Sequence, residues 1–146
     1  MKANELMIGD WVMVDDIEHT HPLQVAEIFN KCGAYYVTLY WDGMPDNVNP
    51  QTLVADVDKV FPIPLTQEIL EKNGFVLKPD GWIWCDCDGI EDQNYIFIQF
   101  RKGCDEVRLI ELNFVNNVLA KFQKIQFVHE LQHALRLCGI EKEIVL

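Results

Sequence analysis

The stretch FPIPLTQEILEKNGF, residues 61–75, separates two differently patterned parts of the chain. Pro62 and Pro64 lack backbone donors and therefore interrupt regular hydrogen bonding at this point. Thr66 follows as a favourable N-cap residue, and Gly74 stands where helices commonly end in a left-handed residue. The sequence thus predicts a domain boundary at the prolines and a short helix that begins at Thr66.

Before this boundary, residues 6–62 have the pattern of short strands separated by turns. A turn at Gly9 precedes the alternating stretch DWVMVD, and Cys32-Gly33 separates PLQVAEIFN from AYYVTLYWD, which is rich in aromatic residues. TLVADVDKVFPIP is the last extended stretch. Closing so short a sheet would remove its exposed edges. We therefore predict a small β-barrel of the Src-homology-3-like class over residues 1–62.

After the helix, the stretches FVLK, GWIWCD, YIFIQF and EVRLIEL predict an antiparallel meander, with VLAKFQ as a candidate further strand. A final helix is expected from about Phe127 to Cys138, closed by Gly139, and EIVL is a candidate terminal strand. The expected fold class is α+β. In this prediction, residues 63–146 form a helix–antiparallel β-meander–helix unit packed on the barrel.

Composition limits the classes of partner. The 146 residues are 49% apolar and carry 12 basic against 23 acidic side chains, a net charge of −11. This charge disfavours binding to a nucleic-acid backbone or to an anionic membrane surface. No apolar run is long enough for a membrane span or a signal peptide. Five cysteines without an export signal indicate reduced thiols and a cytoplasmic protein.

The string His129-Glu130-Leu131-Gln132-His133 matches HExxH, the pattern of zinc-dependent hydrolases. On a helix, His129 and His133 lie on one face and can both hold Zn²⁺, while Glu130 acts as general base on the bound water. A catalytic zinc needs a third protein ligand. The extended motif would place Gly and His where this chain has Arg136 and Gly139, and only 13 residues follow His133.

Helix phase also speaks against the zinc interpretation. With Phe127 at zero and about 100° per residue, Leu131 and Leu135 form an apolar stripe, whereas His129 and His133 fall roughly opposite it. We therefore expect both imidazoles to face solvent and predict neither catalytic residues nor a metal site here. Zinc binding by His129 and His133, with Glu130 as base, is the alternative.

Three cysteines form a weaker constellation. Cys85 and Cys87 lie on one face of a predicted strand, and together with Cys104 and a histidine they could hold structural zinc. The spacing lacks the CxxC pairs typical of such sites. Reduced, partly buried cysteines are the favoured interpretation, and whether these three bind metal stays open.

Three blocks of the chain carry a resemblance. MKANELMIGDWV, PIPLTQEILEKNGF and FVHELQHALRLCGIEKEI together resemble a family of small uncharacterised proteins of Bacteroidetes, many of them in prophage or other mobile-element neighbourhoods. In that family the closing block often has Gln where Glu130 stands, which argues against a general base. The resemblance implies a two-part layout and a mobile-element origin, and it transfers no catalytic residue.

The leading functional hypothesis is a non-enzymatic binding or adaptor protein without a cofactor. A protein partner is favoured over nucleic acid, a membrane is not expected, and a homo-oligomer is a candidate assembly. Zinc-dependent hydrolysis is the first alternative. The second is a nucleic-acid-binding module that uses the barrel and the basic side chains of the last third, namely Arg101, Lys102, Arg108, Lys121, Lys124 and Arg136.

Overall fold

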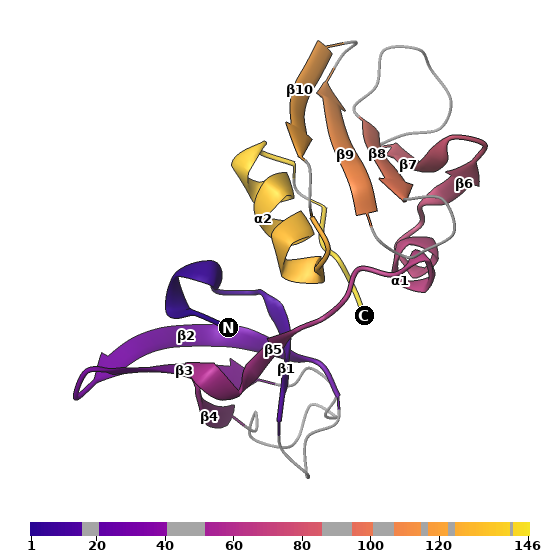
Figure 1. The fold of residues 1–146 in the computed structure, drawn as a ribbon. Coiled ribbons are helices and arrows are strands. Elements are labelled where there is room, and N and C mark those ends of the chain that lie inside the picture. The colour runs from indigo at the N-terminus through magenta and orange to yellow at the C-terminus, as the bar shows by residue number, and fades with distance from the viewer. Residues whose placement is uncertain are drawn as a thin grey trace, which may run out of the picture. The chain divides into compact units, whose positions relative to one another are not determined.

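The computed structural model describes residues 1–15, 21–40, 52–85, 95–100, 107–114, 117–122, 125–140 and 142–146. Backbone contacts divide the chain into two units, Met1–Ile63 and Pro64–Leu146. This division falls inside the proline-bearing segment, one residue beyond the boundary predicted after residue 62. Each unit contains one five-stranded antiparallel sheet (Figure 1).

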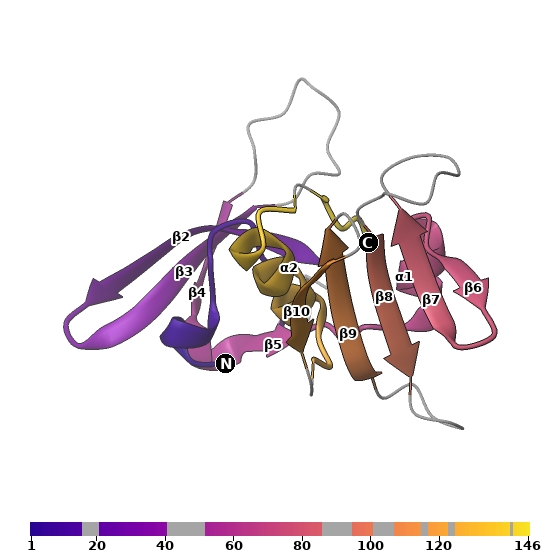
Figure 2. The same ribbon diagram turned by 90° about the horizontal axis from the view of Figure 1, so that it is seen from above.

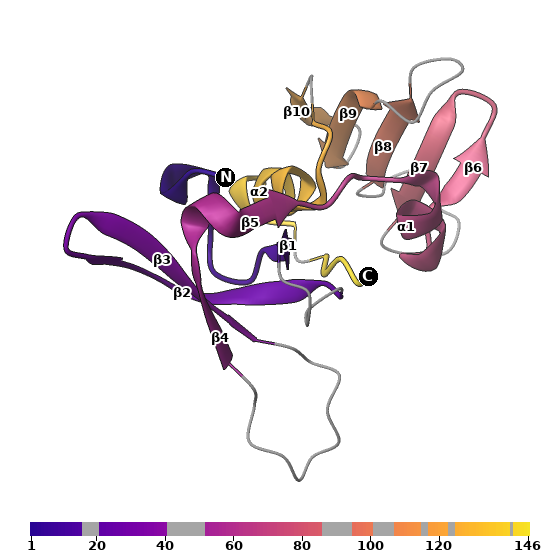
Figure 3. The ribbon, with the colours of Figure 1, turned by 60° about the horizontal axis from the view of Figure 1, so that its bottom comes forward.

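The first unit is built from short strands and two turns of 3₁₀ helix. Its sheet has the strand order β4-β3-β2-β1-β5, and β2 and β3 form its longest hairpin (Figure 3). The elements, in chain order, are η1 (Ala3–Glu5), β1 (Trp11–Val14), β2 (Leu23–Lys31), β3 (Ala34–Tyr40), β4 (Thr52–Asp56), η2 (Val57–Lys59) and β5 (Val60–Pro62).

One face of this sheet carries the core of the unit. Burial alternates along β1 and along the second half of β3, so Val12 and Val14 are buried, as are Val37 and Leu39. This is the alternation that the sequence pattern of β1 predicted. The buried side chains form one apolar cluster, against which η1 packs through Ala3.

The predicted closed barrel is wrong. In the described residues β4 and β5 are the two edges of an open sheet, and they do not pair with each other. The physical reason lies between them, because η2 turns the chain after Asp56 and delivers β5 to β1 instead. Asp56 stabilises this turn, since its Oδ1 accepts a hydrogen bond from the Asp58 N–H at 3.0 Å. The free edges are short, and β5 ends in Pro62, which protects an edge.

A two-residue turn joins β2 to β3. Lys31 pairs with Ala34, and the intervening Cys32 and Gly33 have φ angles of 54° and 87°. Two positive φ angles define a type I′ turn, which suits the twist of a hairpin but strains most residues other than Gly, Asn and Asp. The Asn30 side chain supports the turn by accepting from the Gly33 N–H at 3.3 Å.

Replacing Cys32 with Asn should stabilise the first unit by about 0.5–1 kcal/mol, because Asn tolerates the left-handed conformation better than Cys. Urea unfolding followed by circular dichroism measures the change. Cys32→Ser is the control, because it removes the thiol but keeps the strained conformation. Equal stabilities of the Asn and Ser variants would contradict the assigned turn.

The second unit carries a meander flanked by two α-helices. The sheet has the order β10-β9-β8-β7-β6, with α1 at its β6 end and α2 at its β10 end (Figures 1 and 2). The elements are α1 (Gln67–Lys72), β6 (Val76–Lys78), β7 (Gly81–Cys85), β8 (Tyr95–Phe100), β9 (Val107–Phe114), β10 (Asn117–Phe122) and α2 (Val128–Leu137). The candidate strand VLAKFQ is therefore confirmed as β10.

The predicted fold class, a barrel followed by a helix–meander–helix unit, is wrong as a whole. The chain is mostly β, with two antiparallel sheets, and the described residues contain only two α-helices, of six and ten residues. The expected terminal strand in EIVL is wrong as well, because residues 142–146 belong to no strand. Local pattern identified most strands and both helices, but it did not reveal that the first sheet stays open.

The ends of α1 agree with the sequence. The Thr66 side-chain oxygen accepts from the Ile69 N–H at 3.3 Å, which confirms the predicted N-cap. Gly74 has φ 75°, and the Phe75 N–H donates to the Leu70 carbonyl at 3.0 Å, which closes the helix in a left-handed C-terminal motif. Leu70, fully buried, fixes the helix to its unit.

Gly81 begins β7 at a close approach between backbones. A Cβ at this position would lie 2.5 Å from the Ile98 carbonyl oxygen and 2.8 Å from the Phe97 ring. Both neighbours belong to β8, which pairs with β7 along its length. Only glycine therefore fits here without a shift of the sheet.

Gly81→Ala should destabilise the protein by about 3 kcal/mol, because the new methyl group meets backbone that cannot yield. Gly74→Ala is the matched control. Gly74 has open space around its missing Cβ, so this change costs only the left-handed strain, about 1 kcal/mol. Thermal unfolding of both variants gives the comparison, and equal losses would rule out the close approach.

No helix in the described ranges is long and apolar enough to cross a lipid bilayer.

Candidate functional site

The HExxH string lies on α2 and brings its two histidines together. The ring centroids of His129 and His133 are 5.6 Å apart with the planes at 80°, and His129 also stacks on Phe127 at 5.9 Å. His129 is 5% exposed, whereas His133 is half-buried. The pair thus forms an aromatic contact along one side of the helix.

The expectation that both imidazoles face solvent is wrong for His129. The apolar stripe was centred on Leu131 and Leu135, but Val128 and Gln132 are also buried. Val128 stands about 100° from Phe127 on the helical wheel, so it moves the centre of the buried face towards His129. More than half of the circumference of α2 is buried. The apolar residues alone mark a narrower face, so their pattern did not predict the burial of His129.

Glu130 has a structural task at the start of α2. Its Oε2 accepts hydrogen bonds from the Gln126 N–H at 2.7 Å and the Phe127 N–H at 3.2 Å. Phe127 is the N-cap and Glu130 the third residue of the helix, so the carboxylate makes the glutamate half of a capping box at the start of α2. The oxygen that a hydrolase would use as base is thereby engaged by the backbone.

The described residues contain no group of three or more His, Cys, Asp or Glu side chains that could hold a metal. Cys87 and Cys104, and the side chain of Cys85, lie outside the described part of the chain. Of the cysteines within it, Cys32 is exposed and Cys138 half-buried, and both are free thiols. Burial raises the pKa of the Cys138 thiol, which disfavours an activated thiolate there.

Glu130→Ala should lower the stability of the protein by about 1 kcal/mol, because two N–H groups lose their acceptor. Glu130→Gln keeps an oxygen acceptor and loses only the charge next to the helix N-terminus, so its cost should be about 0.5 kcal/mol. Chemical unfolding of the two variants tests the capping role. A Glu130→Ala variant as stable as the original chain would remove that role.

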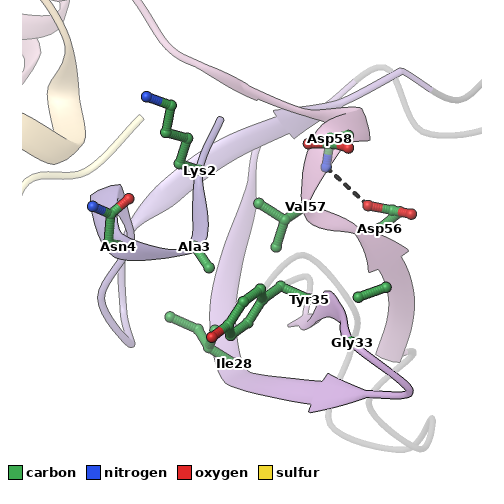
Figure 4. A pocket seen from close by; sticks show the side chains of 10 residues that line it. Lys2, Ala3, Asn4, Ile28, Gly33, Tyr35, Asp56, Val57 and Asp58 are labelled. Carbon is green, nitrogen blue, oxygen red and sulfur yellow. Dashed lines mark hydrogen bonds between the residues drawn. The ribbon is translucent and has the colours of Figure 1, made fainter.

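A pocket of about 770 Å³ lies in the first unit (Figure 4). Three parts of the unit form it: the N-terminal 3₁₀ turn, the β2–β3 hairpin and η2. The lining residues are Lys2, Ala3, Asn4, Ile28, Gly33, Ala34, Tyr35, Asp56, Val57 and Asp58.

The middle of the pocket is lined mainly by apolar side chains. Ala3, Ile28 and Val57 point towards the middle, and the ring of Tyr35 lies between them (Figure 4). Tyr35 is 52% exposed although its neighbours are apolar. The pocket therefore offers an aromatic face that a ligand can cover.

Hydrogen bonds fix the walls of the pocket. The α-amino group of Met1 donates to the Val60 carbonyl at 2.9 Å, which ties the N-terminal turn to the end of η2. Within that turn, Oε2 of Glu5 accepts from the Lys2 N–H at 2.8 Å. Because these hydrogen bonds hold the N-terminal turn against the end of η2, the pocket is formed before any ligand arrives.

The sequence pattern did not predict this pocket, although one signal was present. Tyr35 has the same alternation as the buried Val37 and Leu39, so its side chain lies on the core face of β3. It precedes them at the hairpin end of the strand, where the core stops. A large aromatic residue in core alternation next to a predicted turn is the feature that could have indicated a site.

The first unit is strongly acidic. Residues 1–63 carry ten acidic and three basic side chains, a net charge of −7. Asp56 and Asp58 contribute to the pocket lining, and Lys2 is the only basic residue among the described residues that line it.

Comparison of the chain with protein-family models, with curated proteins and with solved structures finds no match.

Proposed function

We propose that the first unit is a protein-binding module whose pocket takes a bulky apolar side chain from a partner segment. The main support for this proposal is the half-exposed ring of Tyr35, which is flanked by Ile28 and Val57 in a preformed pocket. Exposed aromatic side chains in apolar surroundings dominate the binding energy of protein interfaces. A single large side chain fits such a pocket, whereas a flat surface would not select one.

Charge indicates the chemistry of the partner. A unit with a net charge of −7 attracts cationic segments over several ångströms and repels phosphate backbones. Asp56 and Asp58 place two carboxylates beside the apolar centre. The favoured partner is therefore a segment in which Lys or Arg flanks a large apolar residue.

The lining residues favour binding over chemistry. The described residues that line the pocket include no Cys, His, Ser or Thr, and the carboxylate of Asp56 already accepts a hydrogen bond from the Asp58 N–H. The histidine pair belongs to α2 in the other unit, where Glu130 caps the helix. These features support an adaptor or binding role and favour no hydrolytic reaction.

The test is selection from a displayed peptide library on the immobilised protein. We expect enrichment of peptides that combine a large apolar residue with neighbouring Lys or Arg. Tyr35→Ala should weaken the selected peptides at least tenfold, about 1.4 kcal/mol, because it removes the central contact surface. Fluorescence anisotropy with the best peptide measures the loss.

Val54→Ala is the matched control, because Val54 is 57% exposed in the same unit but does not line the pocket. It should leave peptide affinity unchanged. Peptides that bind the Tyr35→Ala variant as well as the original chain would place binding elsewhere. A selection without enrichment would refute the proposed function.

A further inference from the structure

The last five residues of the second unit are held by a side chain that lies far away in sequence. Residues 142–146 are called the strap. Asn73 donates through Nδ2 to the Val145 carbonyl at 2.7 Å, and its Oδ1 accepts from the Val145 N–H at 2.8 Å. One carboxamide thus satisfies both backbone groups of a strap residue, and Asn73 itself is buried.

Two aromatic rings hold the other end of the strap. The Lys142 ammonium lies 4.5 Å from the centre of the Trp84 ring and 5.6 Å from that of Phe75. Burial takes part of the hydration from the Lys142 ammonium and so lowers the pKa of this side chain. Contact with the ring faces replaces some of this hydration.

The strap alternates like an extended chain. Lys142 is half-buried and Ile144 is 1% exposed, whereas Glu143 and Val145 are exposed. This two-residue period directs a cationic and a branched apolar side chain inward. The strap is thus held by backbone recognition at one point and by side-chain recognition at two others, which is how proteins bind extended peptides.

The end of α2 does not depend on the strap. The Gly139 N–H donates to the Arg136 carbonyl at 3.1 Å, and the Ile140 N–H donates to the Leu135 carbonyl at 2.9 Å. These bonds complete the C-terminal motif of α2 before the strap begins. Release of the strap therefore leaves the helix with its capping bonds.

We propose that Asn73, Phe75 and Trp84 form a peptide-binding site, the strap site, and that residues 142–146 are its resident ligand. The partner is an extended segment of another protein, with Lys or Arg followed two residues later by Ile or Val. Such a segment makes the strap's own contacts. Because the strap is tethered, it competes at an effective concentration of about a millimolar. A partner segment binds when the strap is weakened or displaced.

The experiment releases the strap and supplies the same sequence in trans. Ile144→Asp places a charge at the buried position of the strap and should free it. The probe is a dye-labelled, N-acetylated peptide of sequence KEIVL, followed by fluorescence anisotropy. We expect the Ile144→Asp variant to bind the probe at least tenfold more tightly than the original chain does.

Three controls identify the contacts. Glu143→Gln changes an exposed strap residue and should leave probe binding as weak as in the original chain. Asn73→Ala added to Ile144→Asp should abolish binding, because the backbone of the probe loses both partners. A probe with Gln in place of Lys should bind about fivefold less tightly, since the contact between cation and ring is lost.

Val145→Pro is a second, milder release variant, because it removes the N–H that donates a hydrogen bond to Asn73 Oδ1. If both variants fold and neither of them binds the probe, the proposal is overturned. Failure of both variants to fold would also overturn it, because the strap would then be part of the folding core. If the released chains ignore the probe but associate with intact chains, the occupant is a second copy and the proposal is wrong.

Discussion

Short strands and helices leave many backbone N–H and C=O groups at element ends, where no ladder or helical turn can satisfy them. In this protein, side chains take over that task. Thr66 and Glu130 cap the starts of α1 and α2, and Asp56 fixes the turn between β4 and β5. Asn73 does the same for Val145, 72 residues further along the chain. The internal fold of each unit depends on these bonds.

This constraint changes the meaning of the HExxH string. Glutamate at the third position of a helix is a common capping residue, and histidines four residues apart meet on any helix. Glu130 accepts two backbone hydrogen bonds, and His129 packs between Phe127 and His133. The HExxH pattern can therefore arise from helix capping and side-chain packing as well as from catalysis. The hydrogen-bond partners of the glutamate distinguish the structural role from the catalytic one.

The same constraint shaped the candidate binding sites. The pocket of the first unit exists because the N-terminal turn and η2 are held by backbone and capping bonds around Tyr35. Residues 142–146 pair with no strand, and the Asn73 carboxamide supplies the hydrogen bonds that a neighbouring strand would otherwise give to Val145. In both places, side chains that end regular structure also define the surface that a partner would contact.

The sequence by itself determined the local features, such as the alternation of β1, the turn at Cys32-Gly33 and the cap at Thr66. These depend on residues a few positions apart, so a short pattern contains their cause. Only the tertiary structure decided that the first sheet stays open, that His129 is buried and that Tyr35 lines a pocket. Each of these outcomes depends on segments distant in the chain, whose pairing and packing no local pattern records.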